Sequence, residues 1–170
     1  KNYHSKIERH LFNSKATINY KNKYELVRLG IGLFGVTNNK GLHQISTMTS
    51  VVSQIKIINK GEFVGYGMNY CSNERVKIGI IPFGYADGIY EKKNSDNYYV
   101  FIKNNKYKVI GDISMDSLVV NLENSKIEEG DKVILFDSNY TIKEIAKSCN
   151  TSEYEMLSKL NRRIKREYYS

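Results

Sequence analysis

The amino-acid sequence predicts a mainly β protein whose larger part is an antiparallel β domain. Short runs rich in β-branched and aromatic residues follow one another between residues 48 and 136, at the spacing expected of an antiparallel sheet. Asn104 and Asn105 separate two of these runs like the turn of a hairpin. Two helix start signals lie near the C-terminal end, so helices are expected to be a minor part of the domain.

The first 42 residues differ from the rest and are predicted to be a separate unit, 1–42. Residues 26–36 read Leu-Val-Arg-Leu-Gly-Ile-Gly-Leu-Phe-Gly-Val. A continuous apolar run of this kind predicts a strand that is buried on both faces, as in a parallel sheet. Burying Arg28 within this run is costly unless its charge is paired, so Arg28 is a candidate functional residue. A polar turn at 37–41 marks the boundary.

Residues 43–170 are predicted to form the antiparallel β domain. Its expected strands span residues 48–58, 76–83, 98–103, 107–110, 113–122 and 132–136. Capping boxes at 141–144 and 152–155 each predict the start of a short helix. Leu157 and Leu160 are three positions apart in the second helix and are expected to face the core.

Composition excludes several classes of protein. The chain has 170 residues, of which 41% are hydrophobic and 26% are charged, and these values are typical of a globular protein. No apolar run reaches the roughly 18–20 residues that a membrane span needs, and the first residues lack the apolar core of a secretory signal. The two cysteines are far apart and match no metal-site spacing. We therefore expect a cytoplasmic protein with reduced thiols and no metal site.

The net charge of +8 raises the question of an anionic partner. Most of the positive charge comes from scattered lysines, and the one dense cluster lies at 162–166. We interpret this cluster as solvated surface. An alternative of a different class stays open, because a basic, tyrosine-rich β domain can bind single-stranded nucleic acid by stacking and phosphate contacts.

Four local patterns are candidates for a functional site. They are Gly65-Tyr66-Gly67, the segment 81–88 that contains the only proline, the glycine bend at 111–116, and the helix start at 150–155. Glycines beside Tyr66 allow a ligand to approach the backbone closely. The amides of a helix start favour anions. Each pattern taken alone is also compatible with a structural turn.

The order and spacing of these patterns resemble the C-terminal half of alanine racemase, a pyridoxal-phosphate enzyme. The segments that carry the resemblance are His10-Leu-Phe-Asn-Ser14, Val27-Arg-Leu-Gly-Ile-Gly-Leu-Phe-Gly35, Gly65-Tyr-Gly67, Gly84-Tyr-Ala-Asp-Gly88, Ser114-Met-Asp116 and Tyr154-Glu155. The resemblance implies that 1–42 is a remnant of a (β/α)8 barrel, of which 10–14 and 27–35 are late strands. It implies that 43–170 is the C-terminal β domain of that family.

The resemblance implies a racemase that interconverts L-alanine and D-alanine for bacterial peptidoglycan, with pyridoxal 5'-phosphate as cofactor. Tyr66 is similar to the family's catalytic tyrosine, which exchanges a proton on one face of the substrate while a cofactor-bearing lysine serves the other. A phenol has a pKa of about 10, so a tyrosine that acts as a base near neutral pH needs cationic neighbours or a matched partner. In the family this tyrosine comes from the neighbouring subunit, so a homodimer is expected.

Further site residues follow from the same resemblance. Arg28 matches the arginine that faces the pyridine nitrogen and leaves it largely unprotonated, and His10 is its expected orienting neighbour. The expected phosphate contacts come from Ser14, the backbone of Gly30 and Ile31, and the hydroxyl of Tyr154. The expected substrate contacts come from the backbone of Met115 and Asp116, and from Tyr85 at the mouth of the site.

The sequence also departs from the family. The segment of Val-Lys-Ala-Asn-Ala-Tyr-Gly type that carries the family's lysine is not present, so we expect the 170 residues alone to be inactive. Glu91 and Asp112 stand where the family commonly has arginines. We expect this reversal of charge to alter the access of an anionic carboxylate or the preference among amino acids. A broader-specificity or serine racemase and an inactive fragment remain alternatives.

Overall fold

The computed structural model describes residues 7–21, 24–37, 39, 41–89, 98–123 and 125–169. The chain divides into two compact units, Lys1–Ser46 and Thr47–Ser170, which we call unit 1 and unit 2. The predictions for the first six residues and for Glu91 concern positions outside the described ranges.

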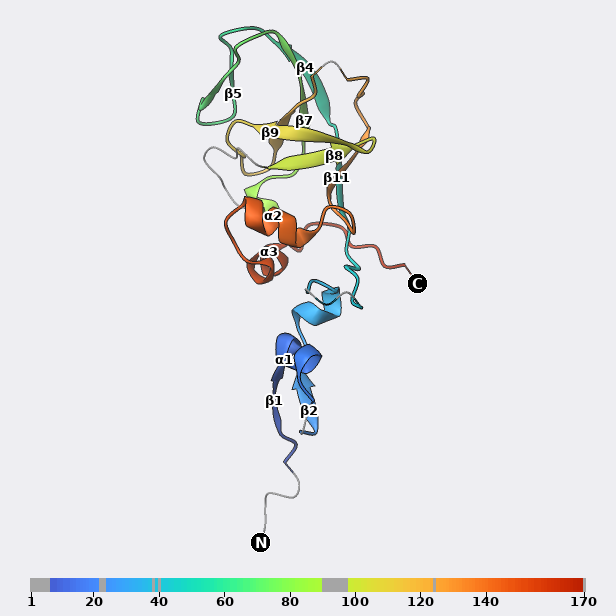
Figure 1. Cartoon of the computed structure of the whole chain (residues 1–170). Helices are drawn as coiled ribbons and strands as arrows, with labels where there is room; N and C mark the ends of the chain where they lie inside the picture. The colour runs from blue at the N-terminus through green and yellow to red at the C-terminus, as the bar shows by residue number, and fades with distance from the viewer. Residues whose placement is uncertain are drawn as a thin grey trace. The chain divides into compact units, whose positions relative to one another are not determined.

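Unit 1 is built on one pair of parallel strands. Its elements are β1 (His10–Asn13), α1 (Ser14–Asn19), β2 (Leu26–Arg28) and the 3₁₀ helix η2 (Ile31–Phe34). In the pairing of β1 with β2, His10 lies opposite Leu26 and Asn13 lies opposite Arg28. Figure 1 shows α1 beside this pair. The helix starts where it does because Asn13 Oδ1 accepts a hydrogen bond from the amide of Ala16 at 3.0 Å.

The structure corrects the prediction of a doubly buried strand over residues 26–36. The strand β2 ends at Arg28, and the chain continues into η2. Gly30 leaves the extended conformation at φ −133° and ψ −99°, and Gly35 ends η2 at a φ of +69°, a value that glycine adopts without strain. Leu26 and Leu29 are 43% and 45% exposed, because β1 is the single strand paired with β2 among the described residues.

Unit 2 contains a seven-stranded sheet whose neighbouring strands are all antiparallel, as predicted (Figure 1). The strand order is β3-β11-β8-β9-β10-β7-β4. The strands span Met48–Val51 (β3), Gln54–Ile58 (β4), Val76–Ile81 (β7), Tyr99–Ile102 (β8), Asn105–Ile110 (β9), Leu118–Asn121 (β10) and Lys132–Phe136 (β11).

The sheet curls into a half-barrel, because its two edge strands are consecutive in the chain. Val52 and Ser53 join β3 to β4. The amide of Val52 donates to the Asp131 carbonyl at 2.9 Å, beside β11, and the amide of Ser53 donates to the Ile80 carbonyl in β7 at 2.8 Å. The chain therefore crosses from one end of the strand order to the other within two residues, which requires strong curvature.

Side chains that alternate along the strands fill the curled sheet. In β8 and β10 every second residue is buried, as expected when one face of a sheet is covered. The largest fully buried side chains include Tyr98, Ile81, Leu118, Leu122 and Leu135. This continuous apolar core gives the loops at the ends of the strands a rigid support.

Two short helices complete unit 2, α2 (Ile142–Ser148) and α3 (Glu153–Lys159). The predicted box at 141–144 is complete, because Thr141 and Glu144 exchange hydrogen bonds between side chain and backbone. At 152–155 only half of the box forms. Ser152 caps α3, but the Glu155 carboxylate accepts from the Thr151 hydroxyl at 2.7 Å instead. Met156 is the buried residue of α3, and Leu157 and Leu160 are half-buried.

Other predicted strands differ from the structure for local reasons. The predicted strand 48–58 is divided into β3 and β4 by the corner at Val52 and Ser53. The predicted strand 113–122 is reduced to β10, because the Ser114 hydroxyl closes a turn by bonding to both the amide and the carbonyl of Ser117. A short hairpin of β5 (Phe63–Val64) and β6 (Tyr70–Cys71) was not predicted.

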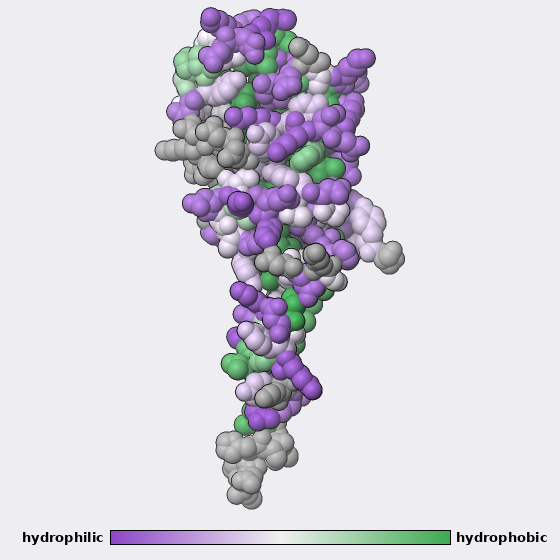
Figure 2. Space-filling model, viewed as in Figure 1, coloured by the Kyte–Doolittle hydropathy of each residue, from purple (hydrophilic) through white to green (hydrophobic). Residues whose placement is uncertain are grey.

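Hydrophilic residues spread over the visible face of unit 2, with apolar residues between them (Figure 2). Within the described part of the chain, no helix is both long and apolar enough to cross a membrane.

Candidate functional site

Tyr66 lies at the tip of the β5–β6 hairpin with 93% of its surface exposed. Gly65 has a φ of +87°, and a Cβ at this position would lie 2.8 Å from the amide nitrogen of Asp112. The side-chain amide of Asn69 donates a hydrogen bond to the Asp112 carboxylate. The hairpin therefore rests on the bend at Gly111–Asp112, and only glycine fits at position 65. The phenol of Tyr66 extends from a supported loop into solvent.

Tyr85 and Met115 lie on two loops that are bonded to each other. The amide of Tyr85, in the 3₁₀ helix η3 (Tyr85–Asp87), donates to the Ser114 carbonyl at 3.0 Å, and the amide of Ala86 donates to the Met115 carbonyl at 3.0 Å. A Cβ at Gly84 would collide with the same two carbonyls. The loops 84–88 and 114–116 are thus held at a separation that only glycine allows.

Asp87 is a buried carboxylate, with 1% of its surface exposed. Its Oδ2 accepts hydrogen bonds from the amide of Gly84 at 3.0 Å and from Nη2 of Arg163 at 2.6 Å. The same guanidinium lies 3.8 Å from the exposed carboxylate of Asp116. Sequence reasoning missed this pair, because it assigned the cluster 162–166 to solvated surface. The sequence contained one signal of this pair. Asp87 is a charged residue inside a glycine-rich loop next to a core strand, and a buried charge requires a partner.

Tyr154 lies in the first turn of α3 and is 55% exposed. Beyond the end of α3, the side-chain amide of Asn161 donates to the Ala86 carbonyl at 2.8 Å, and its backbone amide donates to the Asp87 carbonyl at 3.2 Å. The helix that carries Tyr154 is therefore connected through the following segment to the loop that carries Tyr85.

In unit 1, Ser14 is 3% exposed and its hydroxyl oxygen accepts two backbone hydrogen bonds. The donors are the amides of Gly30 at 2.9 Å and Gly32 at 3.2 Å. Ile31, between these glycines, is buried and begins η2. Amides that converge on one oxygen in this way can also bind an anionic oxygen. The structure thus brings together the three residues that the resemblance assigns to phosphate in this unit.

Arg28 is exposed, which corrects the expectation of a charged residue inside a buried strand. Its Nη2 donates to the Leu11 carbonyl of β1 at 3.1 Å. Because β2 has one paired strand among the described residues, the guanidinium reaches solvent and needs no buried counter-ion. His10 lies on the same two-stranded pair and is also exposed.

The predicted site residues therefore fall into two groups. His10, Ser14, Arg28, Gly30 and Ile31 belong to unit 1, and Tyr66, Tyr85, Met115, Asp116 and Tyr154 belong to unit 2. Among the described residues, no group of three His, Cys, Asp or Glu side chains could hold a metal ion. Cys71 is exposed, Cys149 is buried, and neither forms a disulfide within the part of the chain that the structure describes.

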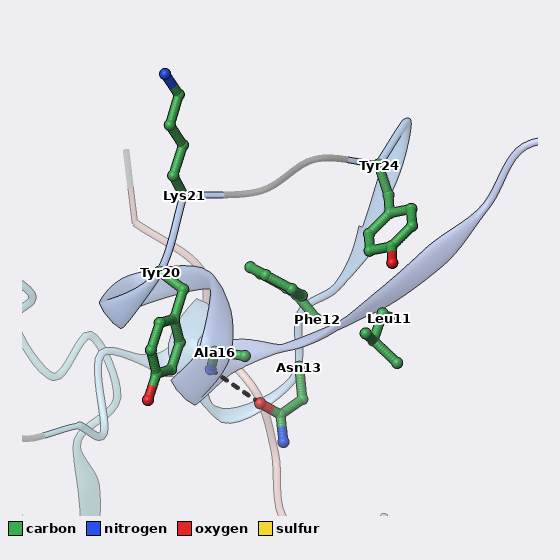
Figure 3. A pocket seen from close by; sticks show the side chains of 7 residues that line it. All are labelled: Leu11, Phe12, Asn13, Ala16, Tyr20, Lys21 and Tyr24. Carbon is green, nitrogen blue, oxygen red and sulfur yellow. Dashed lines mark hydrogen bonds between the residues drawn. The ribbon is translucent and has the colours of Figure 1, made fainter.

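A largely apolar hollow in unit 1 is lined by residues next to these predicted positions in the chain (Figure 3). Phe12 packs edge-on against Tyr20 and Tyr24, with ring centroids 6.5 and 6.3 Å apart. In Figure 3 the side chain of Lys21 extends away from these rings. None of the described residues lining the hollow is a predicted site residue.

The curled antiparallel half-barrel and its glycine-bearing loops define a relative of the amino-acid racemases. The family model described as "Alanine racemase, C-terminal domain" matches residues 45–168. The chain therefore belongs to the alanine racemase family and corresponds to the C-terminal half of its members.

Sequence relatives agree with this assignment. The chain is 34% identical to an alanine racemase of Helicobacter pylori (strain Shi470), over 94% of this chain and 47% of that protein. It is 34% identical to an alanine racemase of Borreliella burgdorferi (strain ZS7), over 99% of this chain and 47% of that protein. The chain thus spans about half the length of the curated relatives it matches.

Solved structures agree as well. The biosynthetic alanine racemase from Pseudomonas aeruginosa superimposes with a TM-score of 0.84 at 28% identity, covering 96% of this chain and 48% of that chain. The alanine racemase from Bartonella henselae, described with covalently bound pyridoxal phosphate, superimposes with a TM-score of 0.84 at 28% identity, covering 95% and 47%.

Proposed function

We propose that this chain supplies the C-terminal half of a pyridoxal-phosphate-dependent alanine racemase, which interconverts L-alanine and D-alanine for peptidoglycan in the bacterial cytoplasm. The observation that carries the proposal is the placement of Tyr66. It extends from a hairpin supported on Gly111–Asp112, within the segment 45–168 that matches the family. Glu91 and Asp112 remain candidates for setting the preference among amino acids.

Racemisation requires that the Cα proton leaves on one face of the substrate and that a proton returns on the other. The phenol oxygen of Tyr66 accepts or donates the proton on one face. When bound, pyridoxal phosphate stabilises the negative charge that develops at Cα. Tyr85 borders the substrate, and the backbone of Met115 and Asp116 orients its carboxylate. The residue for the opposite face belongs to the family's lysine segment, which this sequence does not contain.

We propose that residues of unit 1 contact the phosphate end of the cofactor. The amides of Gly30 and Gly32 donate to the buried Ser14 hydroxyl, and a phosphate oxygen bound at the start of η2 would share such backbone donors with it. In the proposal, Ser14 and the backbone of Gly30 and Ile31 contact the phosphate, and the Tyr154 hydroxyl keeps the phosphate role that the resemblance assigns to it. Arg28 faces the pyridine nitrogen, with His10 as its neighbour.

Unit 1 is proposed to be the last part of a (β/α)8 barrel. The parallel pairing of β1 with β2 supports this, because parallel strands belong to sheets covered on both faces. Exposed apolar side chains such as Leu11, Leu29 and Leu33 are consistent with a surface that further barrel elements cover.

A homodimer follows from the same proposal. Tyr66 is 93% exposed at the tip of its hairpin, so its phenol can enter the cofactor site of a second subunit. Each β domain would then complete the site of its partner.

The test uses the full gene product that carries this chain, assayed with pyridoxal phosphate for the conversion of L-alanine to D-alanine. Tyr66→Phe removes the proton-exchanging hydroxyl, so we expect kcat to fall by about 10²-fold or more. Tyr168→Phe is the matched control, because Tyr168 is 88% exposed in the C-terminal segment, and it should keep parental kcat.

Parental turnover by Tyr66→Phe would refute the assignment of the base. Absence of racemisation in the unmodified gene product would refute the proposed activity as a whole. A parallel assay with L-serine distinguishes an alanine racemase from a serine or broad-specificity racemase.

A further inference from the structure

The segment that follows α3 is bonded to the loop that carries Tyr85. Asn161 donates to the carbonyls of Ala86 and Asp87 from its side chain and its backbone, at 2.8 and 3.2 Å. Its side-chain oxygen accepts from the Arg163 amide at 3.0 Å. Arg163 then places its guanidinium on the Asp87 carboxylate, 2.6 Å from Oδ2 and 2.5 Å from Oδ1. The C-terminal segment thus packs against the loop 84–88 and pairs the buried Asp87 carboxylate with a guanidinium that is itself 55% exposed.

The Asp87 carboxylate depends on this cation. Only 1% of Asp87 is exposed, and a buried carboxylate is unstable unless it is paired and hydrogen-bonded. Its other donor is the amide of Gly84, at 3.0 Å. Without Arg163, the bond from the Gly84 amide would be the remaining stabilisation of the buried Asp87 carboxylate among the described residues. The loop would then open to admit water.

Opening the loop 84–88 would displace Tyr85 and the neighbouring loop 114–116 together. The loop is bonded to the carbonyls of Ser114 and Met115 through the amides of Tyr85 and Ala86, both at 3.0 Å. Gly88, at a φ of +113°, lies so close to the C-terminal end of α3 that a Cβ there would be 2.7 Å from the Lys159 carbonyl. The loop is therefore packed between 114–116 on one side and the C-terminal segment on the other.

We infer that Arg163 is a positioning residue, whose ion pair with Asp87 fixes the loops that carry Tyr85 and Met115–Asp116 in the geometry that binds the substrate. This inference rests on the proposed racemase function. Arg163 acts through Asp87 and does not itself exchange a proton with the substrate. Removal of the Arg163 side chain is expected to weaken substrate binding more than proton transfer, because Tyr66 lies on the β5–β6 hairpin and not on these two loops.

The first measurement is amide hydrogen exchange on the full gene product, which requires no activity. In Arg163→Ala we expect the amides of Gly84, Tyr85 and Ala86 to exchange at least about tenfold faster, whereas amides of the β4–β7 pair keep parental rates. Arg163→Lys keeps the cation and should restore most of the protection. Arg162→Ala is the matched control, because this exposed neighbour has the same charge and, among the described residues, has no ion pair with the loop.

The second measurement separates KM from kcat in the racemisation of L-alanine. We expect Arg163→Ala to raise KM by about tenfold or more and to change kcat by less than about threefold. A purely structural loss of folded enzyme would lower kcat and leave KM unchanged. Asp87→Asn removes the same ion pair. The double variant Asp87→Asn/Arg163→Ala should therefore raise KM by no more than the larger of the two single substitutions does.

The outcomes of these two measurements distinguish a failure of this inference from a failure of the proposed function. If the parent racemises alanine and Arg163→Ala keeps either parental loop exchange or parental KM, the inference is wrong. If the parent racemises no amino acid, the proposed function is wrong, and the exchange rates alone decide whether the ion pair fixes the loops.

Discussion

Ser14 illustrates at the residue scale how one buried hydroxyl can hold two segments of backbone together. It is 3% exposed, and its oxygen accepts from the amides of Gly30 and Gly32. A Cβ at Gly32 would lie 3.2 Å from Ser14, so the approach of the two segments depends on a small residue at each position. Removing the hydroxyl would leave two amides without this acceptor.

Ser14→Ala is therefore expected to release these amides. We predict that Gly30 and Gly32 exchange their amide hydrogens about tenfold faster in the variant, as expected for the loss of a hydrogen bond near 1–1.5 kcal/mol. Amide exchange on the full gene product, measured residue by residue, tests this. Thr17→Ala is the control, because the Thr17 hydroxyl donates to the Asn13 carbonyl on the exposed side of α1. Equal rates in Ser14→Ala and the parent would contradict the role given to Ser14.

At the scale of elements, the β5–β6 hairpin shows how a loop is held in place by close packing. The hairpin has two residues in each strand, too few to hold a loop rigidly by pairing alone. Its support comes from the contact of Gly65 with the backbone of Asp112 and from the bond between Asn69 and the Asp112 carboxylate. The position of Tyr66 thus depends on a contact with the distant bend at Gly111–Asp112.

Gly61 and Gly65 provide a matched pair for testing this support. Both have a φ of +87°, but a Cβ at Gly61 meets nothing within 4 Å, whereas a Cβ at Gly65 meets the Asp112 backbone. Both alanine variants incur the strain of the left-handed conformation, about 1–2 kcal/mol. Gly65→Ala should cost about 1–3 kcal/mol more, because the added methyl group displaces the hairpin.

Urea unfolding of both variants measures the difference in the free energy of unfolding. Racemisation by Gly65→Ala should also fall, while Gly61→Ala keeps its activity. Equal stability and equal activity of the two variants would show that the hairpin does not depend on its contact with Asp112.

At the scale of the whole molecule, the curled sheet buries tyrosines as well as aliphatic residues. Burial raises the pKa of Tyr98 well above its usual value of 10, and burial raises the pKa of Tyr140 to about 12. Tyr98 is 1% exposed and Tyr140 is 8% exposed. These two phenols have to remain protonated for the core to stay closed.

This burial predicts a loss of stability at alkaline pH. The folded state holds the phenol protons more tightly than the unfolded state does. The contribution of these tyrosines to the free energy of unfolding is therefore complete below pH 10 and is lost as the pH rises towards 12. We expect Tyr140 to account for about 1–2 kcal/mol of that loss. Urea unfolding at a series of pH values, with Tyr140→Phe for comparison, measures its share. A variant whose stability falls as steeply as the parent's would contradict the assignment.

Much of unit 2 was predictable from local sequence, because local chemistry determines those features. Runs of β-branched and aromatic residues mark β8 and β10, and the side chains of Thr141 and Glu144 are near enough in sequence to cap α2 by themselves. The glycine-flanked Tyr66 and the Gly84–Gly88 loop stood out because few other residues tolerate such close backbone contacts. Their spacing was sufficient to indicate the family that the segment 45–168 confirms.

Tertiary structure decided what depends on partners distant in sequence. The curl of the sheet arises at Val52 and Ser53, whose hydrogen bonds go to opposite ends of the strand order. The partner of Asp87 is Arg163, 76 residues along the chain, and no local pattern distinguishes it from the exposed arginines beside it. A residue's own neighbours determine its strand, turn or cap. Whether its charge meets a buried counter-charge depends on which distant segments the fold brings together.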